Sequence, residues 1–206
     1  MNIIFDLDGT LIDSRLRLYR LFQHLAPDSK MSFEKYWELK RKKISNEKIL
    51  LSELDYNKVQ VTRFVTKWMK LIETPPFLSL DENFEGIHIA LNHIQQQADL
   101  HVCTSRQFHQ PVLDQLASLD LLHFFKQILV TEQKYTKVSL IASHITNRSI
   151  LDWVVGDTGR DIQVGKLLNM RTCAVLTGFL SRESLEGYNP DLISDSVVNF
   201  SLSNCT

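Results

Sequence analysis

The sequence is poor in cysteine, has no long apolar run and carries almost no net charge, and each shortage excludes a class of protein. Its cysteines, Cys103, Cys173 and Cys205, form no CxxC pair, so neither a zinc site nor a disulfide framework is indicated. No segment approaches the roughly 20 apolar residues that cross a bilayer. The chain reaches the carboxylate of Asp6 with no basic region before it, so we expect no signal peptide and a cytoplasmic protein.

The formal net charge of −1 gives the chain no bulk attraction for nucleic acid. Hydrophobic residues make up 44% and charged residues 23% of the sequence, which is typical of a globular protein and argues against disorder or a fibre. The length of 206 residues fits one domain with a large insertion or two small domains. We expect a small-molecule partner, no nucleic acid or membrane partner, and a monomer or weak homodimer.

Glycine is absent between Gly9 and Gly86, and the apolar residues of this region have helical spacing. The spacing predicts four helices, over residues 15–25, 32–43, 46–54 and 57–72. Ser32 suits an N-cap, and Pro75 with Pro76 is expected to end the bundle. We predict a helical cap over residues 14–81, inserted into a core made of residues 1–13 and 82–206.

The rest of the chain alternates short apolar runs with helical patterns. The runs are continuous, as in strands that are buried on both faces of a parallel sheet. The predicted strands are residues 2–5, 100–103, 127–130, 151–155 and 172–176, and the helices between them are residues 85–96, 110–119, 137–145 and 161–168. This order predicts a doubly wound α/β fold with a Rossmann-like parallel sheet, in which ligands bind at the carboxyl ends of the strands.

Polar residues follow the predicted strands in four places. The first is DLDGT at residues 6–10, where Asp6 and Asp8 face the same way on an extended segment and Gly9 allows a sharp turn. The second is TSR at residues 104–106, which offers hydroxyl and amide groups to an anion. The third is Lys137 at a helix start. The fourth is GDTGRD at residues 156–161, which contains Asp157 and Asp161.

These residue types indicate phosphoryl transfer. Carboxylates gathered at one sheet edge repel each other unless a cation joins them, and an all-oxygen ligand set suits Mg²⁺. The cation and a lysine would neutralise a phosphate dianion, so that an aspartate could approach it as a nucleophile. Phosphoryl transfer depends mainly on such positioning and charge stabilisation.

In this order, the four stretches resemble the motifs of the haloacid dehalogenase-like (HAD) superfamily. The helical insertion after the first stretch resembles the C1 cap of subfamily I, as in its phosphoglycolate phosphatase-like members. The resemblance implies an Mg²⁺-dependent phosphomonoester hydrolase that acts on a small phosphorylated metabolite through an aspartyl-phosphate. Asp6 would be the nucleophile and Asp8 the general acid and base.

The resemblance also implies the remaining site residues. Mg²⁺ would be held by Asp6, the backbone carbonyl of Asp8, and Asp157. Phosphate would be bound by Thr104 and Lys137, with Ser105 and Gly9 beside them. Supporting positions are Asp161, which would steady Lys137 or metal-bound waters, Thr10, and Arg106, which offers an additional anion contact.

Two other functions fit the same residues. A sugar phosphomutase resembling β-phosphoglucomutase would return the phosphoryl group to sugar instead of water. A non-catalytic phosphate-sensing module, such as a response-regulator receiver, also combines aspartates, a threonine and a lysine, but the helical insertion and the DxD pair weigh against it. Lys134 is the alternative to Lys137 as the active lysine.

Outside the motifs we favour structural roles. The basic cap residues are expected to form a solvated helix face rather than to attract an anionic substrate. They are Arg15, Arg17, Arg20 and residues 40–43. Helical aromatic residues are mostly packing residues, so Trp37 and Trp68 are expected in the cap core. The polar tail, residues 197–206, is expected to be loose.

Overall fold

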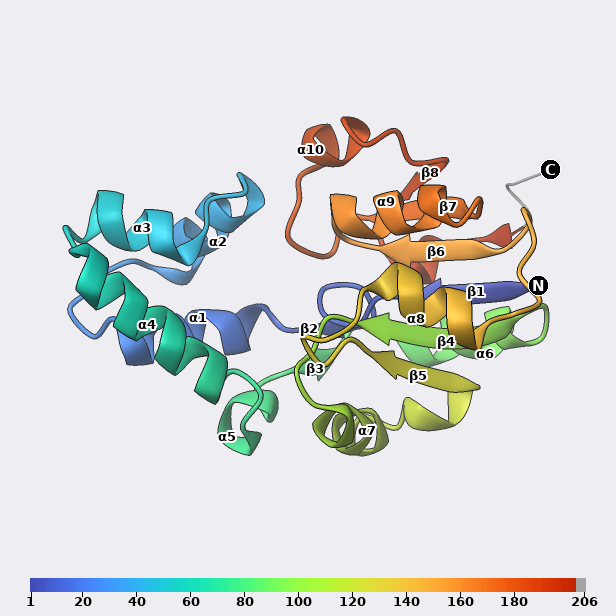
Figure 1. The fold of residues 1–206 in the computed structure, drawn as a ribbon, viewed down its shortest axis with the longest axis horizontal. Helices are drawn as coiled ribbons and strands as arrows, with labels where there is room; N and C mark the ends of the chain where they lie inside the picture. The colour runs from blue at the N-terminus through green and yellow to red at the C-terminus, as the bar shows by residue number, and fades with distance from the viewer. Residues whose placement is uncertain (203–206) are drawn as a thin grey trace.

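The computed structural model describes residues 1–202, so Cys205 and the end of the predicted tail lie outside the described residues. A parallel six-stranded sheet with the order β5-β4-β1-β6-β7-β8 forms its centre (Figure 1). The strands are β1 (Asn2–Phe5), β4 (Asp99–Thr104), β5 (Gln127–Val130), β6 (Trp153–Gly156), β7 (Arg171–Val175) and β8 (Leu192–Ser194). The predicted α/β fold is confirmed.

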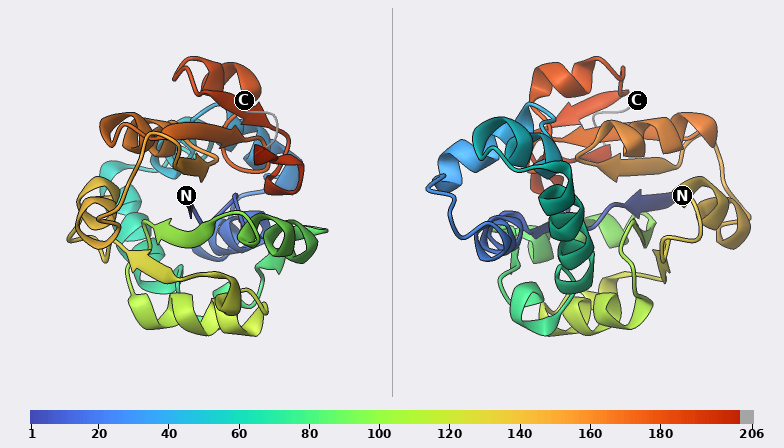
Figure 2. Two further views of the ribbon diagram at one scale, coloured as in Figure 1. Left: turned by 90° about the vertical axis from the view of Figure 1, so that its right-hand side faces the viewer. Right: turned by 60° about the vertical axis from the view of Figure 1, so that its left-hand side comes forward.

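Helices cover both faces of this sheet (Figure 2). Along β1, Ile3 and Phe5 face α6 (Ile87–Gln95) and α7 (His109–Ser118). Ile4 points to the opposite face, where it packs with α8 (Lys137–His144) and α9 (Gly159–Leu167). Successive strand residues alternate between the faces, and both faces are buried, which explains the continuous apolar runs.

A separate helical cluster lies beyond the carboxyl ends of the strands (Figure 1). It consists of α1 (Arg15–Leu25), α2 (Phe33–Arg41), α3 (Asn46–Glu53) and α4 (Lys58–Leu71). The side chain of Ser32 accepts a hydrogen bond from Lys35 N, as an N-cap does. Tyr36 and Phe22 are fully buried in its core, with Trp37 at 8% exposure. We keep the range predicted from the sequence and call residues 14–81 the cap.

Two short strands connect the cap with the sheet. β2 (Ile12–Asp13) pairs antiparallel with β3 (Glu82–Asn83), so the chain enters and leaves the cap side by side. Pro75 and Pro76 do not simply break the chain: Pro75 begins the short helix α5 (Pro75–Leu78). Proline at the first position of a helix loses no intrahelical hydrogen bond, because the first amides have no partner there.

The C-terminal segment is not loose up to Phe200, contrary to the sequence-based expectation. After α10 (Arg182–Glu186) and β8, the 3₁₀ turn η2 (Val197–Asn199) packs on α6. Val197 is 1% and Phe200 4% exposed, and the Phe200 ring lies edge-on to Trp153 at 5.4 Å between centroids. Apolar burial of two side chains fixes this segment although its neighbours are polar. Among the described residues, no helix has the length and apolar character needed to cross a membrane.

Candidate active site

The sheet topology brings the predicted site residues together. β1 lies between β4 and β6, so Asp6 and Asp157, which directly follow β1 and β6, lie near Thr104, the last residue of β4. The amide of Asp6 donates to Val155 O at 2.8 Å, which extends the β1–β6 ladder up to the site. These residues line a cleft of about 720 Å³ together with Asp8 and Lys137, and residues of α1 and α4 also border it.

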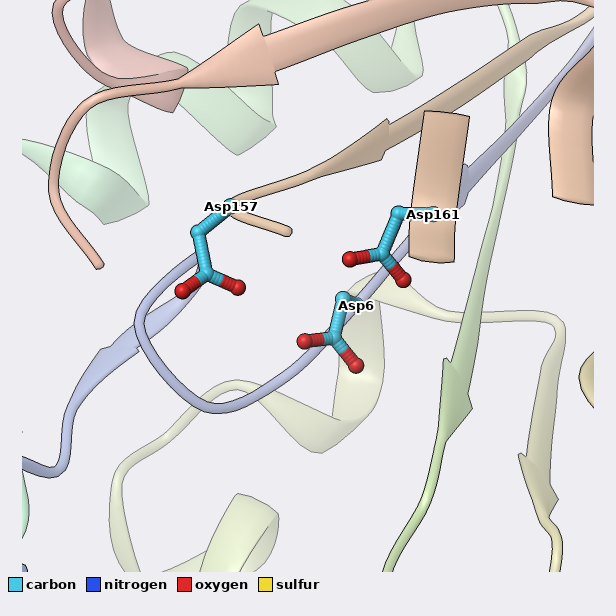
Figure 3. Close-up of side chains that lie close together, drawn as sticks. All are labelled: Asp6, Asp157 and Asp161. Atoms are coloured by element: carbon cyan, nitrogen blue, oxygen red, sulfur yellow. The ribbon is translucent and has the colours of Figure 1, made fainter. Parts of the chain in front are cut away.

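Three carboxylates converge at this edge (Figure 3). One oxygen each from Asp6, Asp157 and Asp161 lies within 4.8 Å of the others. Asp157 is fully buried, and its Oδ1 has no hydrogen-bond partner. An unpartnered buried carboxylate oxygen beside another carboxylate is costly in free energy, and a hard cation would satisfy it. The residues present therefore fit a divalent cation such as Mg²⁺.

Asp161 differs from the other two carboxylates because both its oxygens already have partners. Oδ1 accepts from Lys137 Nζ at 2.6 Å, and Oδ2 accepts from the Thr158 hydroxyl at 2.6 Å and the Thr158 amide at 3.2 Å. The last two contacts cap α9, whose first turn contains Asp161. Asp161 is thus placed to hold Lys137 rather than to bind a cation directly.

Lys137, not Lys134, is the lysine at the site. Its Nζ lies 2.6 Å from Asp6 Oδ1 and also 2.6 Å from Asp161 Oδ1. Burial alone would lower the pKa of Lys137, but the charges of Asp161 and Asp6 outweigh it and raise that pKa. Lys134 is exposed and pairs with Glu132 at 3.7 Å. Thr136 caps α8 and so fixes the helix start that carries Lys137.

The carboxyl groups of the site have unusual pKa values. Burial raises the pKa of Asp6 to about 6, against the attraction of Lys137. Burial, with the neighbouring charges of Asp6 and Asp161, raises the pKa of Asp157 well above its usual value. Both groups would be ionised more readily with a cation between them, because an opposite charge stabilises the ionised form.

A loop that the sequence analysis did not single out holds Asp157. After β7, the amide of Phe179 donates to Asp157 Oδ2 at 2.7 Å, and Thr177 Oγ1 donates to Gly9 O at 2.6 Å. A Cβ atom on Gly178 would lie 1.8 Å from Asp157 Oδ2, so only glycine fits there. A Gly-containing turn directly after a strand was the available signal. The ring of Phe179 also packs on Trp37 of the cap, with 5.4 Å between centroids.

Asp8 is paired with two arginines. Arg106 forms a fork with it, Nε to Oδ2 at 2.5 Å and Nη2 to Oδ1 at 2.7 Å, and Arg17 Nη2 contacts Oδ1 as well. Burial would raise the pKa of Asp8, but the two guanidinium groups outweigh it and hold that pKa well below its usual range. Arg106, expected to offer an anion contact, thus supports Asp8. Arg17 is only 2% exposed, so the predicted solvated face is wrong for this residue.

The other predicted residues have different positions. Thr104 is buried and lines the cleft, and Ser105 lines it as an exposed residue. Gly9 has φ +78°, and its amide donates to Ile12 O at 2.8 Å, so the turn itself uses this donor. Thr10 is fully buried next to it, and its hydroxyl has no hydrogen-bond partner.

Comparison with solved structures shows similar folds in several bacteria. A haloacid dehalogenase-like hydrolase from Streptococcus pneumoniae has 20% identity and a TM-score of 0.77, over 96% of this chain and 94% of that one. A predicted phosphoglycolate phosphatase from Haemophilus somnus has 17% identity and a TM-score of 0.74, over 95% and 94%. The HAD-hydrolase YfnB from Bacillus subtilis, bound to magnesium, has 18% identity and a TM-score of 0.66, over 95% and 94%.

None of the curated proteins compared matches the chain. The family model described as haloacid dehalogenase-like hydrolase matches residues 3–175, which include all four predicted motifs. The match spans the sheet from β1 to β7, the cap and every carboxylate of the site. The chain belongs to the haloacid dehalogenase-like hydrolase family.

Proposed function

We propose that the protein is an Mg²⁺-dependent phosphatase that hydrolyses a small phosphomonoester through an aspartyl-phosphate on Asp6. The observation that carries this proposal is the juxtaposition at Asp6. Lys137 Nζ lies 2.6 Å from one of its oxygens, and the unpartnered Oδ1 of Asp157 belongs to the same carboxylate cluster. This arrangement supplies positive charge to a phosphate beside a carboxylate nucleophile.

The cation would be held by Asp6, Asp157 and the backbone carbonyl of Asp8, and when bound it would neutralise phosphate charge. Lys137 and Thr104 would bind the phosphoryl oxygens. The Asp6 carboxylate attacks phosphorus, and the bond from phosphorus to the ester oxygen breaks. That oxygen takes a proton from Asp8.

In the second step, water attacks the phosphorus of the aspartyl-phosphate, and Asp8 accepts the proton of this water. Phosphate leaves, and Asp6 is regenerated. The pairing with Arg106 and Arg17 favours the ionised form of Asp8, which is the form that accepts a proton. The acid form in the first step requires these contacts to loosen.

The cleft supports a compact substrate. It holds about 720 Å³ between the sheet edge and the cap, a volume suited to a small molecule. One similar structure is named a predicted phosphoglycolate phosphatase, and another is bound to magnesium. A small phosphorylated metabolite agrees with both.

The test is a screen of phosphorylated metabolites with and without Mg²⁺, read as released phosphate. We expect Asp6→Asn to lower the rate on the best substrate at least 1,000-fold, because the nucleophile is lost. Asp28→Asn, at an exposed cap position, is the matched control and should retain full activity. Undiminished hydrolysis by Asp6→Asn would refute the proposal. A phosphorylated protein that persists until a sugar is added would instead indicate a phosphomutase.

A further inference from the structure

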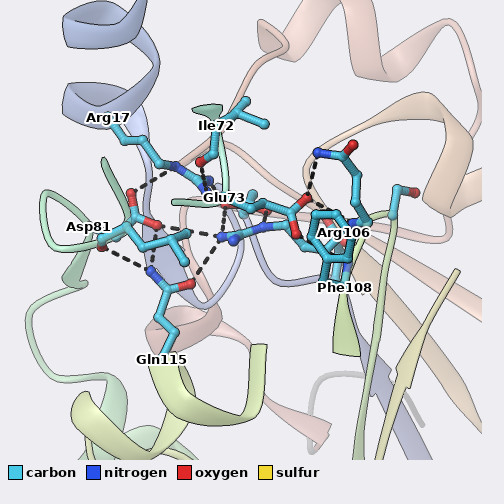
Figure 4. Close-up of polar contacts among 12 residues, drawn as sticks. Arg17, Ile72, Glu73, Asp81, Arg106, Phe108 and Gln115 are labelled. Atoms are coloured by element: carbon cyan, nitrogen blue, oxygen red, sulfur yellow. Dashed lines mark hydrogen bonds and ion pairs between the residues drawn. The ribbon is translucent and has the colours of Figure 1, made fainter. Parts of the chain in front are cut away.

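A buried ion cluster at the junction of cap and core contains Arg17, Arg106 and Asp81 (Figure 4). Both of its arginines also pair with Asp8. Arg17 comes from α1 of the cap, Arg106 from the segment after β4, and Asp81 from the segment before β3. Arg17 is 2%, Arg106 5% and Asp81 5% exposed. Buried charges that are so closely paired are strongly constrained in position, because any unpaired member would be costly.

The contacts of Arg106 fix its fork in one orientation. Besides its two bonds to Asp8, Nη2 donates to Gln115 Oε1 at 3.1 Å and lies 3.5 Å from Asp81 Oδ2. Gln115 in turn donates to Asp81 Oδ2 at 2.7 Å. Gln115 holds Nη2 on one side, Nε and Nη2 form the planar two-bond fork to the Asp8 carboxylate, and the buried Nη1 has no hydrogen-bond partner. The Asp8 carboxylate is therefore held in one orientation.

Arg17 adds a link to the cap. Its Nε lies 3.1 Å from Asp81 Oδ1, without the angle of a hydrogen bond, and its Nη1 donates weakly to Ile72 O at 3.4 Å. The same side chain contacts Asp8. Arg17 thus links Asp8 to Ile72 and Asp81, which stand at the two ends of the segment that leads from α4 back to the sheet.

We propose that Arg106 and Arg17 are positioning residues, which hold the Asp8 carboxylate toward the water that hydrolyses the aspartyl-phosphate. The inference rests on the proposed function, since it assigns Asp8 the role of base. Both arginines would act on the second chemical step through Asp8.

The probe that isolates this step is 2,4-dinitrophenyl phosphate, because dinitrophenolate leaves without a proton. A slower second step then lowers kcat and KM by the same factor and leaves kcat/KM unchanged. For Arg106→Lys, which keeps the charge but cannot form a fork, we expect both constants to fall about 10- to 100-fold. A burst of dinitrophenolate should precede the steady state. Arg17→Lys should show the same pattern to a smaller extent, about 3- to 10-fold.

The controls separate the outcomes. Arg148→Lys alters an arginine that binds carbonyl groups at the end of α8, and should leave kcat and KM within twofold of the parent. Loss of folded protein lowers kcat with KM unchanged, and loss of a substrate contact raises KM; either result in both arginine variants would overturn the inference. Asp8→Asn should show the burst pattern. If Asp8→Asn shows no burst, or if Asp6→Asn remains active, the result would count against the proposed function instead.

Discussion

Two carboxyl groups of the site, Asp6 and Asp157, are buried in surroundings that disfavour their ionised forms. Asp6 and Asp157 lie in one cluster with Asp161, and burial raises the pKa of both. A cation that binds them must replace protons, since it binds the ionised forms. Cation affinity and protonation are therefore linked at these residues.

This linkage predicts a pH-dependent cation affinity. Between pH 5.5 and pH 7.5 the affinity for Mg²⁺ should rise about fourfold through Asp6, because a carboxyl group with a pKa of about 6 is only partly ionised at the lower pH and almost fully ionised at the higher one. Isothermal titration calorimetry in buffers with different ionisation enthalpies measures both the affinity and the protons released. Equal affinity at the two pH values, with no proton release, would contradict the expected linkage.

The stability of the cation-free protein should show the opposite trend. The folded-state pKa of Asp6 is about 6 and its usual value 3.8, so between these values the folded protein keeps a proton that the unfolded chain has lost. The free energy of unfolding therefore falls as pH rises from about 4 to about 6, by about 1–3 kcal/mol from this residue.

Urea unfolding with a chelator at pH 4.5 and pH 7.5 tests this expectation. Asp6→Asn lacks the titrating group, so its stability should fall less across the interval than that of the parent. Asp28→Asn, at an exposed position, should follow the parent. Parallel pH profiles for Asp6→Asn and the parent would show that Asp6 does not contribute.

Side chains of the site were predictable to different degrees. Asp6, Thr104 and Asp157 follow strands that are recognisable from continuous apolar runs, so their meeting at one edge could be expected. Arg17 could not be distinguished from its exposed neighbour Arg20, since helical spacing does not show which arginine faces a buried carboxylate.

At the scale of elements, the loop after β7 controls the position of Asp157. Gly178 packs against the carboxylate, and the next amide donates to it. The sequence gives little indication of such a role, because it depends on contact between segments that follow different strands. β8 and the β2–β3 pair were missed for a related reason: two or three residues are too few to show periodicity.

Gly178→Ala should therefore displace Asp157. The added Cβ would lie 1.8 Å from Asp157 Oδ2, so the loop or the carboxylate must move. We expect a 10- to 100-fold loss of Mg²⁺ affinity, corresponding to about 1–3 kcal/mol. Gly187→Ala is the matched control, because its Cβ would meet nothing closer than 3.6 Å. If both variants bind Mg²⁺ like the parent, this loop does not determine the position of the ligand.

Across the whole molecule, the C-terminal segment completes the core on the side of α6. Phe200 is 4% exposed against Trp153, whereas Val198 in the same turn is 40% exposed. Composition alone predicted a loose tail, because the apolar residues are too few to form a pattern. Only the packing of distant segments shows which of them are buried.

Phe200→Ala should lower the free energy of unfolding by about 3–5 kcal/mol, as for other large-to-small changes in a core. Val198→Ala should change it by less than about 0.5 kcal/mol, the usual range for a surface substitution. Urea unfolding of both variants measures the difference. Similar small effects for the two would mean that Phe200 is not part of the cooperative core.

The central position of β1 also affects how the protein is made. This strand is synthesised before the cap, and its neighbours β4 and β6 follow only after the entire cap has been translated. The cap helices therefore emerge from the ribosome while β1 still lacks both of its hydrogen-bonded neighbours, β4 and β6. Asp6 and Asp157 meet only when β6 has been added, so a chain that is truncated before Trp153 would carry Asp6 without Asp157.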